Sequence, residues 1–325
     1  MRKTDFDFLV ELLHQNAGWS FSEREYFSID KKISNFIREK GYPSVEDLIA
    51  DLKSGQKALV SQVIESLAFA DTRFFRDWNV FNQFEHYVLP LVKEANRNLK
   101  KLRILSLGCS TGQEVYSLAI AVNSLVGLSD WQVSIIGTDL SSAAIAKAQK
   151  GVYNQFEIQT GLNAEAMIDN FTLEGENWRV NDNIKKMVEF RRYNLLDELT
   201  FNEKFDIIFC RNVLRFFTPD IQNRLCAKIH TMQVPGGILY LGKGENIKGI
   251  IDYYGAISGV SCAYQSKLIK EIKIAPEQAI RPEEAYKAVI PGAPLAPAAD
   301  DDMPRFVRPA NLGAKRPIMS DVLRK

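Results

Sequence analysis

The stretch RILSLGCSTGQEVY at residues 103–116 constrains the fold of this chain more than any other. Its first five residues form a short apolar run, which is typical of a strand buried on both faces. Gly108 and Gly112 enclose a turn, and apolar residues recur at helical spacing from Glu114 onward. Strand, glycine turn and helix in this order favour a nucleotide-type cofactor site, because the backbone at Gly108 can approach a ligand that helix-start N–H groups face.

A second apolar segment, at residues 131–137, is predicted to be a strand and ends in Thr138 and Asp139. An acid at the tip of the second strand is well placed to accept hydrogen bonds from both ribose hydroxyls of an adenosine. The glycine turn alone is a weak signal. The acid in register with it makes the cofactor site a fair prediction.

Composition excludes several classes of protein. The 325 residues can form one large domain and a smaller one, and a net charge of +1 does not mark a general nucleic-acid binder. No apolar run approaches the roughly 20 residues of a membrane helix, and acids among the first eight residues argue against a signal peptide. Four cysteines and three histidines lack metal-type spacing. We therefore expect a cytoplasmic monomer with reduced thiols, no metal site and no membrane insertion.

The first part of the chain carries helical patterns only, and we predict a small all-α domain at residues 1–85 with a linker helix to about residue 100. The second of its helices, which ends at Gly41, is basic. A solvated face is the plainer interpretation of such a charge run, and a substrate-binding surface is the functional one. Its cations are Lys31, Lys32, Arg38 and Lys40.

Residues 101–272 alternate strand and helix, which predicts an α/β fold with a parallel sheet covered on both faces. A hairpin at residues 171–180 within a long crossover predicts an inserted β-subdomain at about residues 165–187. Eight of the twelve prolines lie in residues 273–325, so we predict a flexible tail there.

Two classes of ligand suit such a sheet, dinucleotides and S-adenosylmethionine. A dinucleotide would need a third glycine, and Glu114 at the helix start would repel its pyrophosphate. The same carboxylate suits the ammonium of a methionine moiety, which favours S-adenosylmethionine over NAD. Predicted strands at residues 188–193 and 205–210 end in Asn194-Leu195 and Arg211-Asn212. We expect the first pair beside the adenine and the second beside the reacting methyl, although either asparagine alone could serve a turn.

Several phrases, in order, resemble the CheR family of chemotaxis-receptor glutamate O-methyltransferases over about residues 6–270. They are TRFFRD at 72–77, GCSTG at 108–112, TD at 138–139, GVY at 151–153, NLL at 194–196, FDIIFCRNV at 205–213 and GKGEN at 242–246. The resemblance implies a Rossmann-like methyltransferase domain with an inserted small β-subdomain, preceded by a small all-α domain. It also implies that the cofactor site is lined by Thr72, Arg76, Glu114, Asp139, Asn194, Leu195, Arg211 and Asn212.

The implied reaction transfers a methyl group from S-adenosylmethionine to glutamate side chains in the cytoplasmic helical bundle of chemoreceptors. A glutamate side chain has an ordinary pKa of about 4.3 and is an ionised nucleophile at pH 7, so no general base is needed. We expect Arg76 and Arg211 to position that carboxylate, although each could serve the cofactor instead.

The chain departs from the family's pattern at several positions. An expected tyrosine is Phe216, preceded by Arg215, and an expected asparagine is Ala70. Gln113 and Val115 replace an acid and a proline, and Lys243-Gly244 replaces a histidine-serine pair. The changes at Phe216, Ala70 and Lys243-Gly244 support an alternative, a divergent S-adenosylmethionine-binding regulator of a chemosensory pathway with weak or no turnover.

Some members of the family hold a peptide at the receptor's C-terminus on the β-subdomain, and these tend to carry a glycine-rich hairpin loop. Here the loop at residues 173–178 is short and contains two acids, which would repel an acidic peptide end. We therefore predict no such tether and recognition through the basic second helix.

Overall fold

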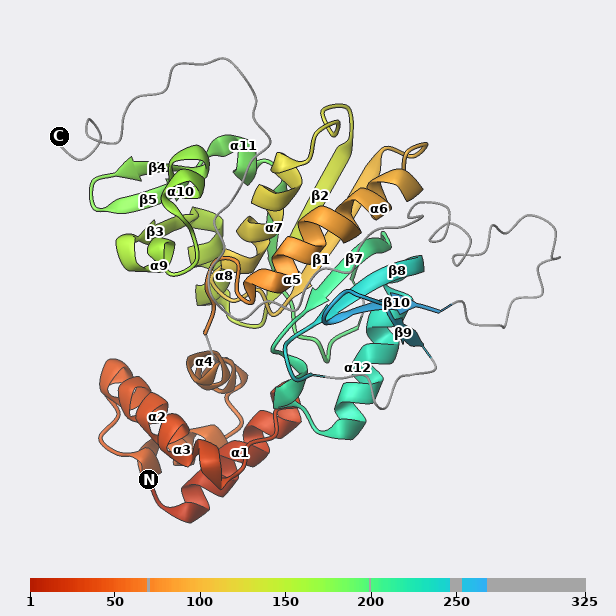
Figure 1. Cartoon of the computed structure of the whole chain (residues 1–325). Helices are drawn as coiled ribbons and strands as arrows, with labels where there is room; N and C mark the ends of the chain where they lie inside the picture. Colours follow the sequence, from red (N-terminus) through yellow and green to blue (C-terminus); the bar gives the residue numbers. More distant parts are fainter. Residues whose placement is uncertain (69–70, 199, 246–252, 268–325) are drawn as a thin grey trace.

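Figure 1 shows the computed structural model, which describes residues 1–68, 71–198, 200–245 and 253–267. Ala70 and the predicted tail at 273–325 lie outside the described residues. No helix in the part of the chain that the structure describes is both long and apolar enough to cross a membrane.

Four helices form an N-terminal bundle, drawn in red and brown in Figure 1. Each buries an apolar stripe in a shared core, as the helical spacing predicts. Gly18 and Gly41 end two of them with φ of 70° and 76°, a left-handed conformation that glycine adopts without steric cost. The helices are α1 (Lys3–Ala17), α2 (Tyr26–Lys40), α3 (Val45–Lys53) and α4 (Lys57–Leu67), and the turn η1 (Glu23–Glu25) precedes α2.

Three consecutive helical segments connect the bundle to the sheet: α5 (Trp78–Gln83), the π-helical turn η2 (Phe84–Val88) and α6 (Leu89–Ala95). Phe84 packs edge-on against Phe209 of the sheet, with ring centroids 5.4 Å apart. The predicted linker helix is thus part of the layer that covers one face of the sheet.

The main sheet has seven strands in the order β6-β2-β1-β7-β8-β10-β9, and the first five are parallel. Alternate residues of each strand face opposite sides, so Ile104 packs in the core that contains α7 and Leu105 in the core that contains α12. The strands are β1 (Lys101–Leu107), β2 (Gln132–Asp139), β6 (Val188–Arg192), β7 (Phe205–Cys210), β8 (Gln233–Leu241), β9 (Tyr254–Ala256) and β10 (Ala263–Ser266). The covering helices include α7 (Gln113–Ser124), α8 (Ser142–Lys150) and α12 (Pro219–Thr231).

The strand order places a crevice at the carboxyl ends of the parallel strands of this sheet. The chain runs from β1 outward to β2 and β6, and then returns to β7 on the other side of β1. In such sheets ligands bind outside the carboxyl ends of the strands, where the order reverses. The loops after β1, β2, β6 and β7 meet at this edge.

A second sheet, β3-β5-β4, lies in the crossover between β2 and β6. The predicted hairpin is confirmed by β4 (Phe171–Glu174) and β5 (Asn177–Val180). The small sheet begins earlier than the predicted insertion at 165–187, because β3 (Val152–Asn154) also pairs with β5. Three short helices, α9 (Gln155–Gln159), α10 (Ala164–Asn170) and α11 (Asp182–Lys185), accompany it.

Two features of the sheet's far side differ from expectation. Strand β8 begins at Gln233 rather than near residue 238, and β9 was not predicted because three residues are too few for a readable alternation. The predicted final strand is confirmed at β10, and its residues beyond 267 lie outside the described part of the chain.

Candidate functional site

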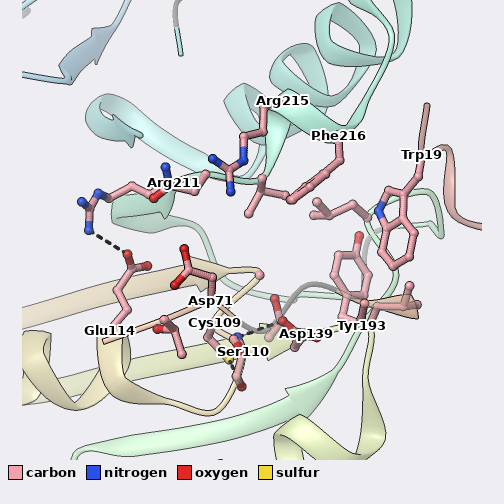
Figure 2. A pocket seen from close by; sticks show the side chains of 18 of the residues that line it. Trp19, Asp71, Cys109, Ser110, Glu114, Asp139, Tyr193, Arg211, Arg215 and Phe216 are labelled. Carbon is pink, nitrogen blue, oxygen red and sulfur yellow. Dashed lines mark hydrogen bonds and ion pairs between the residues drawn. The ribbon is translucent and has the colours of Figure 1, made fainter. Parts of the chain in front are cut away.

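An open cavity lies at the carboxyl ends of the parallel strands (Figure 2). The N-terminal bundle covers one side of it through Ala17, Trp19 and Ala68. All nine residues predicted to bind the cofactor line this one cavity: Thr72, Arg76, Gly108, Glu114, Asp139, Asn194, Leu195, Arg211 and Asn212.

The two glycines of the first turn are required by close packing. A Cβ at Gly108 would lie 2.5 Å from Cγ2 of Val213, and one at Gly112 would lie 2.8 Å from Cβ of Ala148. Both glycines have positive φ, of 72° and 95°. The turn therefore brings bare backbone to the cavity wall, as a close-fitting ligand site needs.

Asp139 stands at the tip of β2 and is fixed from both sides. Its Oδ2 accepts a hydrogen bond from the Ser110 N–H at 2.8 Å and its Oδ1 accepts one from the Ser141 N–H at 2.9 Å. Burial raises the pKa of this carboxyl, although these N–H groups favour its charged form. Each oxygen keeps a second lone pair that can accept a ribose hydroxyl.

Arg211, at the end of β7, is buried between two acids. Its Nη1 donates to Oε2 of Glu114 at 3.0 Å, and its Nη2 donates to a carboxylate oxygen of Asp77 and to the carbonyl of Arg76. The Glu114 Oε1 also accepts a hydrogen bond from the Ser106 hydroxyl at 2.9 Å. Figure 2 shows the Glu114–Arg211 pair at one end of the cavity.

The other two predicted residues of the TRFFRD phrase face the cavity from the segment before α5. Arg76 donates to the carbonyl of Asp71 at 2.7 Å and to its carboxylate at 3.2 Å. Thr72 is half-buried beside this pair and lines the cavity. Since Asp71 is largely exposed, its pairing with Arg76 is weak and can be exchanged for a ligand carboxylate.

The turns after β6 and β7 hold the remaining predicted residues. Asn194 forms a turn, because its Oδ1 accepts from the N–H of Leu196, and its Nδ2 donates to the carbonyl of Asn16 on the N-terminal bundle. The turn interpretation of Asn194 is therefore confirmed, and its place on the cavity wall joins the bundle to the sheet. Asn212 has φ of 60°, a left-handed conformation that asparagine tolerates.

The four predicted cations of the basic helix α2 differ in exposure. Lys31, Arg38 and Lys40 are exposed. The Lys32 ammonium is half-buried and donates to the carbonyls of Leu67 and Ala68, and its burial lowers the pKa of the amine. Lys32 therefore helps to hold the end of α4, and the four cations do not form one free surface.

Sequence reasoning missed several residues of the cavity wall. Trp19 and Tyr193 contribute aromatic surface from the bundle and from the end of β6 (Figure 2). Trp19 forms an isolated β-bridge with Phe217. The two residues are nearly two hundred positions apart in the sequence, so hydrophobic periodicity could not have predicted this contact. Asp77, which holds Arg211 without lining the cavity itself, could have been found, because it ends the TRFFRD phrase directly after Arg76.

Two buried polar atoms on the cavity wall have no partner among the described residues. They are Oγ of Ser110 and Nε of Arg211. Buried polar groups are normally hydrogen-bonded, so such atoms mark places where a ligand or water completes the bonding. Together with the carboxylates of Asp139 and Glu114, this donor and acceptor set fits a ligand that has ribose hydroxyls and an ammonium.

Two family models match the chain in succession. The model for the CheR methyltransferase all-alpha domain matches residues 4–68, and the model for the CheR methyltransferase SAM binding domain matches residues 70–261. This chain belongs to the CheR family. The CheR fold expected from the sequence is thus confirmed, and S-adenosylmethionine is the cofactor.

Curated CheR relatives match most of the chain. Chemotaxis protein methyltransferase 1 of Pseudomonas aeruginosa is 31% identical over 255 residues, which are 77% of this chain and 93% of the relative. Chemotaxis protein methyltransferase Cher2 of Pseudomonas putida is 30% identical over 270 residues, 81% of this chain and 98% of the relative. A chemotaxis protein methyltransferase of Borreliella burgdorferi is 30% identical over 76% of this chain and 89% of the relative.

The departures from the CheR pattern lie in different surroundings. Gln113 and Val115 are buried at the start of α7, where Gln113 accepts a hydrogen bond from the Thr111 hydroxyl. Phe216 lines the cavity, and its ring lies 6.3 Å from that of Phe21. Phe216 therefore lies at the cavity, whereas Gln113 and Val115 are buried at the start of α7.

Proposed function

We propose that this CheR-family chain transfers the methyl group of S-adenosylmethionine to side-chain carboxylates of glutamates in the cytoplasmic helical bundle of chemoreceptors. Support comes from the lining of the cavity. Of the described residues that form it, none is a histidine or a lysine. An acceptor that must lose a proton would have no histidine or lysine there to take it, whereas a carboxylate needs no base at pH 7.

Other ionisable groups at the cavity also suit this proposal. Burial raises the pKa of the Cys109 thiol well above its ordinary value and raises that of the Tyr193 hydroxyl. Both groups stay neutral at pH 7, so neither supplies a competing nucleophile.

Bound S-adenosylmethionine supplies an electrophilic methyl carbon, whose bond to sulfur breaks as the acceptor oxygen bonds to it. In our proposal Asp139 accepts the two ribose hydroxyls, and Glu114 accepts the ammonium of the methionine end. The backbone at Gly108 and the turn at Asn194-Leu195 enclose the nucleoside. Catalysis is then mainly positioning, which in well-oriented systems contributes roughly 7–11 kcal/mol.

We assign different roles to Arg76 and Arg211, which were both predicted to position the substrate carboxylate. The guanidinium of Arg211 already holds two acids, which weighs against its binding a substrate carboxylate, and we assign it to positioning Glu114. Arg76 has one weak ion pair that a ligand can replace, so it remains a candidate for a carboxylate of cofactor or substrate. These assignments remain predictions.

Recognition of the receptor is proposed to use the exposed cations Lys31, Arg38 and Lys40 of α2 in the cytoplasm. The turn between β4 and β5 is short and flanked by Glu174 and Glu176, which disfavours a tethered acidic receptor peptide. The interaction would thus be salt-sensitive and direct.

One incubation separates this function from the regulator alternative. Purified protein is mixed with methyl-labelled S-adenosylmethionine and membranes that carry chemoreceptors but lack their own methyltransferase. We expect label on protein of receptor size, and none with the Asp139→Ala variant. Binding of S-adenosylhomocysteine without transfer of label would instead support the regulator.

A further inference from the structure

Four arginines line the cavity, and their surroundings differ. Arg211 is buried between two acids, and Arg76 pairs with Asp71. Arg73 and Arg215 have no ion pair with any residue that the structure describes. Unlike Arg76, these two can bind an anion without first giving up an ion pair.

Arg215 is the one held in a defined place. Its guanidinium carbon lies 5.1 Å from the centre of the Phe216 ring, an arrangement that orients a guanidinium and leaves its edge N–H groups available. Figure 2 shows this side chain reaching into the cavity between Arg211 and Phe216. Arg73 and Arg215 are both exposed, but for Arg73 the structure shows no such ring contact.

The backbone beneath Arg215 is fixed by Glu245. One carboxylate oxygen of Glu245 accepts from the Arg215 N–H at 3.1 Å, and the other accepts from the N–H groups of Asn212 at 2.8 Å and Gly242 at 2.7 Å. A Cβ at Gly242 would lie 2.6 Å from the Asn212 nitrogen, so the two loops meet without room for a side chain. Residues 242–245 of the GKGEN phrase, which the proposed function leaves without a role, thus hold the backbone of Arg215 in place.

We propose that Arg215 binds the acceptor glutamate and directs one of its carboxylate oxygens at the methyl group. This inference rests on the proposed function and names the residue that holds its substrate. A guanidinium donates two parallel hydrogen bonds to a carboxylate, one to each oxygen. A second lone pair on the attacking oxygen stays free for the reaction.

The same contact explains how product would leave. During transfer the attacking oxygen forms a bond to carbon, the carbon–sulfur pair passes to sulfur, and no proton moves. The product ester is neutral, so Arg215 loses its ion pair while keeping its own charge. Attraction to the acceptor is thus strong before the reaction and weak after it.

The test compares three variants of the full chain in the receptor-membrane assay. Arg215→Met removes the charge, Arg215→Lys keeps a charge without the planar fork, and Arg224→Met is the matched control. Among the described residues Arg224 pairs with Asp220 on the surface of α12, where both side chains are more than two-thirds exposed. Rates of base-labile methyl transfer are measured against receptor concentration, and binding of S-adenosylhomocysteine is measured by calorimetry.

We expect Arg215→Met to lower kcat/KM for the receptor by about ten- to a hundredfold, the loss typical of a charged hydrogen-bonded contact. Arg215→Lys should lie between it and the wild type, and Arg224→Met should match the wild type. Binding of S-adenosylhomocysteine should change by less than about twofold in all three, because Arg215 is assigned to the acceptor.

Three outcomes would overturn the proposal. Equal rates for Arg215→Met and the wild type would overturn it and leave the proposed function standing. A parallel loss of S-adenosylhomocysteine binding would assign Arg215 to the cofactor instead. Wild-type protein that transfers no base-labile label would overturn both the proposed function and this inference.

Discussion

Arg211 donates a hydrogen bond from Nη1 to Oε2 of Glu114 across 3.0 Å, and this joins the end of β7 to the start of α7. The Arg211 side chain is 1% exposed, and Asp77 holds its other terminal nitrogen. Of the two acids, Glu114 lines the cavity, and the buried cation fixes its carboxylate there. That carboxylate suits the ammonium of S-adenosylmethionine.

Replacing Arg211 should therefore damage the fold as well as the site. Arg211→Met leaves Glu114 and Asp77 as partly buried acids without a cation, and we expect the free energy of unfolding to fall by about 3–5 kcal/mol. Urea unfolding measures this. Adding Asp77→Asn should restore part of the loss, and a change below about 1 kcal/mol would mean that the pair behaves as a surface ion pair.

Asp139 should make cofactor binding depend on pH. Its pKa is raised by burial, so its carboxylate is lost as pH falls through that raised value, and affinity for S-adenosylhomocysteine should fall with it. Asp139→Asn should weaken binding by at least about tenfold and remove this part of the pH dependence. Calorimetry across acidic and neutral pH checks both, and an unchanged pH profile in the variant would exclude Asp139 from the site.

The same raised pKa has a consequence for stability. The folded chain holds the Asp139 proton more tightly than the unfolded chain, so this group's contribution to stability is present at low pH. It is lost as pH rises through the raised pKa. Neighbouring Glu65 acts in the same direction by disfavouring the charged form.

Reversing charge on α2 should slow methylation of receptors. Lys31→Glu with Arg38→Glu changes two exposed cations, and Lys32 is left alone because its ammonium holds the end of α4. The defect should shrink as salt rises, since screening weakens the attraction in the wild type. Lys204→Glu, on the loop before β7 at the opposite edge of the sheet, is the control. Equal rates in all variants would remove α2 from recognition.

Removal of a receptor's C-terminal residues should leave its methylation rate unchanged. The β4–β5 turn carries acids and a single glycine, Gly175, and offers a peptide no cation at its tip. Rates with full-length and truncated receptor, at equal concentrations, check this. A large drop on truncation would show that the β-subdomain does hold a tether.

Much of this site could be predicted from the sequence, because the residues concerned lie next to the strands that position them. The glycine turn and the acid at position 139 depend on residues adjacent to their own strands, so pattern and spacing suffice to place them. Hydrophobic patterns do not specify the order of the strands, but parallel strands bring their carboxyl ends together in any order. That is why Asp139 and Asn212, which follow different strands, could be expected near one another, and both line the cavity. Thr72 follows no strand of the sheet and was expected there only from the resemblance to the family.

Contacts between segments that are distant in the sequence could not be predicted. Trp19 reaches the cavity because the bundle docks on the turn after β7, where the Ser20 N–H donates to the Phe216 carbonyl at 2.7 Å. The helical pattern of α1 does not predict this docking. Lys32 was grouped with free cations because its sequence neighbours are basic, and only packing against α4 distinguishes it. Ion pairs such as Arg211 with Asp77 likewise depend on tertiary structure.

The chemical class of the product tests the central claim most directly. Receptor protein labelled by the purified chain is treated with mild base, and the released and retained label are measured. A methyl ester on a glutamate side chain hydrolyses to carboxylate and methanol, so the account predicts that the label is released. Label that stays on the protein, as on methylated lysine or arginine nitrogen, would contradict it.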